Sequence, residues 1–65
     1  MRLNVLRIKV IMAEKELTQN TVAEEAGFAK QSLSLMFSKG KCSVVSAGKI
    51  AKALKVPVSD IILED

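Results

Sequence analysis

The stretch QNTVAEEAGFAKQSLSLMFS, residues 19–38, decides the fold of this chain. Within it, Ala23 is a small residue that allows two helices to cross closely, and Gly27 stands where the chain must turn with a positive φ. Leu33 and Met36, three positions apart, form the inward stripe of a second helix. The pattern predicts a helix-turn-helix, in which a tight turn joins the two helices and the second is held out from the domain body.

The composition limits the chain to one small domain without cofactor chemistry. Its 65 residues suit a single domain, residues 1–65, and with two phenylalanines and no tryptophan or tyrosine its core is aliphatic. One cysteine and no histidine provide neither an intrachain disulfide nor a zinc site, and no constellation for catalysis. The longest uncharged stretch, residues 31–38, is too short to span a membrane. We therefore expect a cytoplasmic protein that is not an enzyme and binds no metal, cofactor or small-molecule ligand.

Apolar spacing predicts a helix before this stretch, over about residues 4–16. Val5, Ile8 and Met12 recur at helical intervals. Residues 6–10 also alternate like a β-strand, but this alternation is short and the residues after it favour a helix. A helix is therefore the preferred interpretation.

Capping residues predict where the next helices begin. Thr18 is a suitable N-cap of the second helix, although Thr21 also begins a capping-box pattern that would start it three residues later. The earlier start is preferred because Leu17 then precedes the cap and Val22 falls in the first turns, as in a hydrophobic staple. The third helix is expected from residue 29 or 30 to residue 37, without a side-chain cap.

Two further helices complete the prediction. Ser43 is a suitable cap for a fourth helix, and Pro57 suits the entry to a last short helix over residues 58–63. In the fourth helix, the residues expected to face inward are Ala47, Ile50, Ala51 and Leu54.

Positive charge is concentrated in the middle of the chain. No acidic residue occurs from Ala26 to Ser59, and a positive field of this kind suits a surface that binds a polyanion. Lysines at positions 49, 52 and 55 also suit an ordinary solvated helix surface. The lysines in this window are Lys30, Lys39, Lys41, Lys49, Lys52 and Lys55, and the acids outside it are Glu14, Glu16, Glu24, Glu25, Asp60, Glu64 and Asp65.

Several short motifs occur in a characteristic order: Leu17-Thr18-Gln19, Val22-Ala23-Glu24, Gly27, Leu33-Ser34, Met36-Phe37, Lys49-Ile50-Ala51-Lys52-Ala53-Leu54 and residues 58–62. In these motifs the chain resembles the lambda-repressor-like helix-turn-helix family, the Xre/Cro type of bacterial and phage regulators. The similarity extends over about residues 8–63. It implies an all-α compact bundle of five short helices, in which helices 2 and 3 form the helix-turn-helix.

The chain departs from this family at a few positions. The loop over residues 38–42 is one residue shorter than usual, and Met12 replaces a common arginine. Glu16 and Lys55 stand where the family often has glycine.

The resemblance implies a sequence-specific, double-stranded DNA-binding transcriptional regulator, and we expect a repressor. Its third helix would enter the major groove. Gln19 would bond a phosphate at the start of the second helix, where free N–H groups attract anions. Lys30, Gln31 and Ser34 would read base edges, since their side chains can bond guanine, adenine or either base.

The remaining candidate DNA contacts are less specific in their chemistry. Thr18 accompanies Gln19, and Ser32 suits either a phosphate or a base. Leu35 suits a thymine methyl group or a dimer contact, and both alternatives stay open. Lys39 and Lys41, expected just past the third helix on either side of a glycine, are candidate phosphate clamps.

A homodimer on DNA is expected, because one such module reads few base pairs and two copies would bind half-sites about one helical turn apart. An apolar row of Leu3, Leu6 and Val10 on the first helix, with Ile62 and Leu63, is the candidate interface. The alternative function is a helical protein-interaction module that has kept the fold and lost DNA binding.

Overall fold

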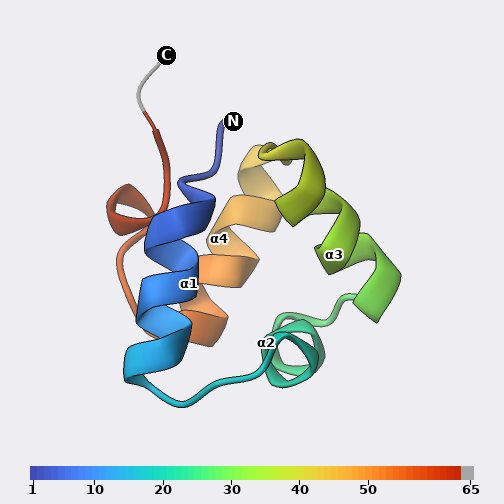
Figure 1. Cartoon of the computed structure of the whole chain (residues 1–65). Coiled ribbons are helices and arrows are strands. Elements are labelled where there is room, and N and C mark those ends of the chain that lie inside the picture. Colours follow the sequence, from blue (N-terminus) through green and yellow to red (C-terminus); the bar gives the residue numbers. More distant parts are fainter. Residues whose placement is uncertain (64–65) are drawn as a thin grey trace.

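The computed structural model describes residues 1–63, and its regular elements are helical (Figure 1). This confirms the all-α class. The elements are α1 (Val5–Glu14), α2 (Gln19–Ala26), α3 (Lys30–Lys39), α4 (Val44–Leu54) and a short 3-10 turn, η1 (Val58–Asp60).

Short polar side chains begin three of these helices. Asn4, Thr18 and Ser43 are the N-caps of α1, α2 and α4, and each accepts a hydrogen bond from a backbone N–H of the first turn. The Thr18 hydroxyl accepts from the N–H of Thr21 at 3.1 Å, which confirms the earlier start of α2 and excludes the later one. Ala29 precedes α3 and provides no side-chain cap, as predicted.

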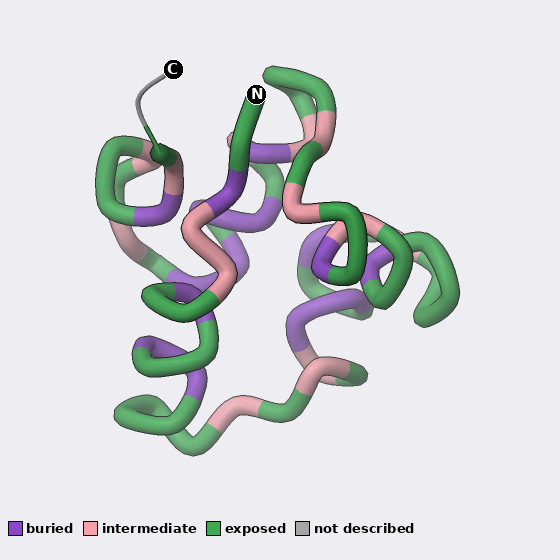
Figure 2. The backbone as a smooth tube through the Cα atoms, turned by 45° about the horizontal axis from the view of Figure 1, so that its top comes forward, coloured by how far each residue is buried: buried purple, intermediate pink, exposed green. Residues whose placement is uncertain are grey.

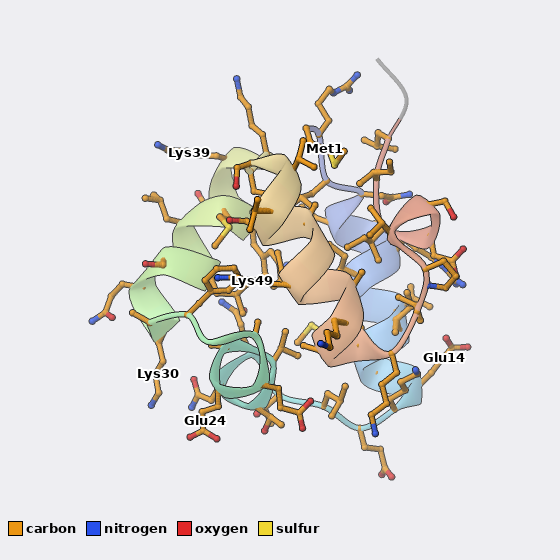
Figure 3. All side chains as sticks on the ribbon, turned by 180° about the vertical axis from the view of Figure 1, so that it is seen from behind. Met1, Glu14, Glu24, Lys30, Lys39 and Lys49 are labelled. Atoms are coloured by element: carbon orange, nitrogen blue, oxygen red, sulfur yellow. The ribbon has the colours of Figure 1, made fainter. Side chains whose placement is uncertain are left out.

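Helix α4 lies at the centre of the bundle, with α1 on one side and α3 on the other (Figures 1 and 3). Helix α2 packs against both α3 and α4, and its Ala23 is buried, as the small residue at a close crossing requires. Figure 2 shows that buried and exposed positions alternate along each helix, so each has one face toward the core. The largest fully buried side chains are Ile8, Val22, Leu33, Ile50, Leu54 and Ile61.

Among residues 1–63, four turn residues have left-handed backbone conformations. Gly27 ends α2 with a φ of 80°, as predicted, and Gly40 ends α3 with a φ of 70°. Glu16 and Lys55 have φ values of 56° and 60° but carry side chains, which costs about 1–2 kcal/mol at each position. The conformation explains why glycine suits these two positions.

Lys55→Gly is expected to raise the free energy of unfolding by about 1 kcal/mol, because the left-handed strain exceeds the entropy that glycine adds to the unfolded chain. The Lys15 ammonium donates to the carbonyl oxygens of Leu54 and Lys55, and this substitution keeps both acceptors. Urea unfolding measures the change. Lys52→Gly is the matched control inside α4, where the same exchange should cost about 1 kcal/mol. A loss of stability in both variants would contradict the assignment of strain to Lys55.

The expected helix over residues 58–63 does not form. Only η1 is helical in this range, and Ile62 then pairs with Leu3 in an isolated antiparallel β-bridge beside the N-terminus. The N–H of Asn4 donates to the carbonyl of Ile61 at 2.8 Å, and the N–H of Leu63 donates to that of Arg2 at 3.0 Å. These bonds replace helical ones while the Ile61 side chain still reaches the core.

The position of Leu3 also differs from the prediction. It precedes α1, pairs with Ile62 in an isolated β-bridge and is only 2% exposed, so it does not belong to an apolar row on the helix surface. Leu6 and Val10 are exposed on α1, as expected. Ile62 is partly buried and Leu63 is exposed.

Candidate nucleic-acid interface

The outer face of α3 gathers the side chains predicted to read bases. Lys30, Gln31 and Ser34 are all exposed, and Leu35 beside them is 54% exposed. These residues and Ser38 line an open depression on the surface of α3. The depression contains charged, amide, hydroxyl and methyl groups, and no acidic residue lines it. We call it the reading face.

The opposite face of α3 anchors the helix. Leu33 is fully buried and Phe37 is 9% exposed, while Met36 is partly buried against the same core. Because these apolar side chains point inward, the reading face is held outward. In Figure 3, Lys30 and Lys39 extend away from the body of the molecule at the two ends of α3.

Ser38 lines the same depression and is a candidate site residue that the sequence did not predict. Its spacing of four positions from Ser34 and seven from Gln31 is a helical signal, but the helix was expected to end at residue 37. The helix continues to Lys39 because Gly40 caps it, with the Gly40 N–H donating to the Met36 carbonyl at 2.8 Å. Lys39 is therefore the last residue of α3 rather than part of the following loop.

The turn before α3 is stabilised by contacts other than a side-chain cap. The N–H of Phe28 donates to the carbonyl of Ala23 at 2.8 Å. The Lys49 ammonium lies 5.8 Å from the centroid of the Phe28 ring, within the range of a cation–π interaction. Lys49 thus connects α4 to the turn that positions the first residues of the reading face.

Thr18 and Gln19 lie at the start of α2. The Thr18 hydroxyl caps this helix and also shares a hydrogen bond of 2.9 Å with the Thr21 hydroxyl. Gln19 is the first residue of α2 and is half-buried. Free N–H groups at this helix end are a suitable partner for a phosphate.

Lys39 and Lys41 flank Gly40 and are both exposed. With Met1 and Cys42 they line another open depression, next to the end of α3. Burial raises the pKa of the Cys42 thiol, and the N-terminal ammonium lowers it to a smaller extent. Raising that pKa keeps the thiol protonated and neutral, so Cys42 is a poor nucleophile and adds no negative charge beside the lysines.

Other candidate positions are separate from the reading face. Ser32 is exposed on α3 but does not line the depression. Between α2 and α4, Lys49 and Lys52 share a depression with Glu25, so this surface has mixed charge. Its composition suits a solvated helix surface better than a polyanion site.

In residues 1–63, no group of metal-ligating side chains is close enough to hold an ion. No helix in this described part of the chain has the length and apolar character needed to cross a membrane.

A family model describing the Cro/C1-type HTH DNA-binding domain matches residues 7–63, nearly the whole chain. No curated protein and no solved structure matches. The matched range contains α2, the turn at Gly27 and α3, whose geometry is that of a helix-turn-helix. The chain therefore belongs to the Cro/C1-type helix-turn-helix DNA-binding family.

Proposed function

We propose that this protein is a transcriptional regulator that inserts α3 into the major groove of double-stranded DNA and represses by occupying its site. The observation that carries the proposal is the reading face, where Lys30, Gln31 and Ser34 lie exposed around one depression free of acidic residues. Such a protein acts in the cytoplasm of a bacterial or phage-infected cell.

Each side chain of the reading face has a distinct partner in this proposal. Lys30 donates to guanine O6 or N7, Gln31 bonds adenine through its amide, and Ser34 suits either base. Leu35 contacts a thymine methyl group, and its position inside the depression favours this role over a dimer contact.

Phosphate contacts surround the reading face. Lys39 and Lys41 neutralise phosphates at one end of α3, and Gln19 with Thr18 receives a phosphate at the start of α2. Ser32, outside the depression, reaches the sugar-phosphate backbone. These contacts set affinity and its dependence on salt.

Gln31→Ala is expected to change the preferred base at one position. Lys41→Ala is expected to weaken binding to all DNA sequences alike and to reduce the slope of log affinity against log salt by about one. Selection of bound sites from a random DNA pool, followed by titrations at several salt concentrations, measures both effects. A uniform loss of affinity in both variants would show that Gln31 does not read bases.

We further propose that two copies pair through the outer face of α1. Leu6 is 75% exposed and Val10 is 41% exposed, and Ala13 extends this stripe by one turn, away from the buried face. Arg7 and Glu14, seven positions apart, lie on one flank of the stripe. We place two α1 helices antiparallel about a two-fold axis near Val10, so that the same flank of each helix lies on the same side of the interface. Arg7 of each copy then approaches Glu14 of the other.

This interface leaves the reading face free. Figure 3 shows Glu14 of α1 and Lys30 of α3 on opposite sides of the molecule. The selected DNA sites also report how the two copies bind, because paired half-sites in one duplex would appear as a repeat of fixed spacing.

Arg7→Glu and Glu14→Arg are each expected to raise the dimer dissociation constant about tenfold, since either change turns two attractive pairs into repulsive ones. An equimolar mixture should recover a heterodimer of wild-type affinity, because both interchain pairs are then opposite in charge. Sedimentation equilibrium measures this. Lys52→Glu, on α4, is the matched control. A wild-type chain that stays monomeric at high concentration, free and on DNA, would refute the interface.

A protein-interaction module without DNA binding is the competing function, and the exposed Leu6 and Leu35 are the observations that favour it. Titration with random duplex DNA separates the two functions. A steep fall of affinity with salt supports DNA binding, and no binding at low salt supports the alternative.

A further inference from the structure

The loop that carries Lys41 is held by the first residues of the chain. The N–H of Leu3 donates to the carbonyl of Gly40 at 2.8 Å, and the N–H of Cys42 donates to the carbonyl of Met1 at 3.0 Å. Arg2 and Lys41 face each other in an antiparallel β-bridge between these two bonds. We call residues 1–4 the N-terminal segment. Its backbone thus pairs with the short loop at residues 40–42.

The N-terminal segment is itself fixed in two ways. Its other edge pairs with the C-terminal part of the chain, through the bond from Asn4 to Ile61 and the bond from Leu63 to Arg2. The Leu3 side chain is 2% exposed and belongs to the hydrophobic core. Leu3 therefore connects the loop to the core through one buried side chain and one backbone bond.

This placement matters for the phosphate contacts. Lys39 and Lys41 lie on either side of Gly40, whose carbonyl accepts the bond from Leu3. A phosphate contact is strongest when its ammonium group is already held in position, because ordering a loop during binding loses about tenfold in affinity for each residue fixed.

We propose that the N-terminal segment is a positioning element for DNA-backbone binding, with Leu3 as the residue that holds the Lys41 loop in its binding conformation. The inference rests on the proposed DNA binding. Leu3 touches no DNA in this arrangement, and it acts through Lys41. Loss of the Leu3 side chain therefore weakens binding to all DNA sequences alike and leaves base preference unchanged.

The test is a double-mutant cycle between Leu3→Ala and Lys41→Ala, at a temperature where circular dichroism shows every variant folded. Leu3→Ala should weaken DNA binding about tenfold and lower the salt slope by about one. In the Lys41→Ala background the same change should have less than a twofold effect. Ile8→Ala, an equally buried truncation in α1, is the matched control and should leave affinity near wild type.

A second measurement needs no DNA. Amide hydrogen exchange at Cys42 should be more than tenfold faster in Leu3→Ala than in Ile8→Ala, the matched core truncation, which lowers global stability without releasing the loop. If the alanine variants do not fold, Leu3→Val and Ile8→Val replace them. An equal loss of affinity with and without Lys41, or exchange at Cys42 no faster than in Ile8→Ala, would overturn this inference alone. Absence of salt-dependent DNA binding by the wild type would instead refute the proposed function.

Discussion

Leu33→Ala is expected to lower the free energy of unfolding by about 3 kcal/mol, because it removes a fully buried side chain and leaves a cavity beneath α3. A domain of 65 residues has a total stability of only about 3–10 kcal/mol. The loss is therefore about a third or more of the total, and the variant should unfold at a markedly lower temperature than wild type. Urea unfolding at low temperature, followed by circular dichroism, measures the loss.

Leu35→Ala is the matched control, since the residue type and the helix are the same but the side chain is 54% exposed. Its free energy of unfolding should stay within about 0.5 kcal/mol of wild type. Its affinity for sites with thymine at the contacted position should fall, while the fold persists. Equal losses of stability in both variants would mean that α3 is not anchored through Leu33.

Ser34→Glu is expected to weaken DNA binding by at least about 100-fold, because a carboxylate in the reading face would lie against phosphates and base acceptors. The fold should be retained, since Ser34 is exposed and glutamate favours a helix as much as serine does. Fluorescence anisotropy with a selected site measures the affinity, and circular dichroism confirms the fold.

Ser59→Glu is the matched control on η1, where the serine is also exposed. It adds the same charge outside the reading face and should change affinity less than threefold at moderate salt, where distant surface charges are screened over about 10 Å. Retained affinity in Ser34→Glu would mean that α3 does not enter the groove and would favour the protein-interaction alternative.

The parts of the fold set by local physics could be predicted from sequence. A small residue at Ala23, a left-handed turn at Gly27 and a cap at Thr18 each act within a few positions along the chain, and the structure confirms all of them. The inward residues predicted for α4 are buried as well. The reading face followed from the same periodicity, because exposed positions lie opposite buried ones.

The parts that depend on distant contacts could not be predicted. Leu3 and Ile62 are apolar residues that local periodicity assigns to helices, yet they meet across the whole length of the chain in a β-bridge. Backbone bonds of this kind leave no pattern in side-chain spacing. The end of α3 was uncertain for a different reason, since Lys39 continues the helix only because Gly40 provides its cap.

The N-terminal segment also covers two backbone edges that would otherwise be open to pairing with other molecules. It occupies the middle position between the loop at residues 40–42 and the tail at residues 61–63, so its removal would unpair two backbone edges at once. The newly open tail edge carries the apolar side chains of Ile62 and Leu63. Open edges of this kind recruit strands from other molecules, so keeping residues 1–4 in place matters for solubility as much as for stability.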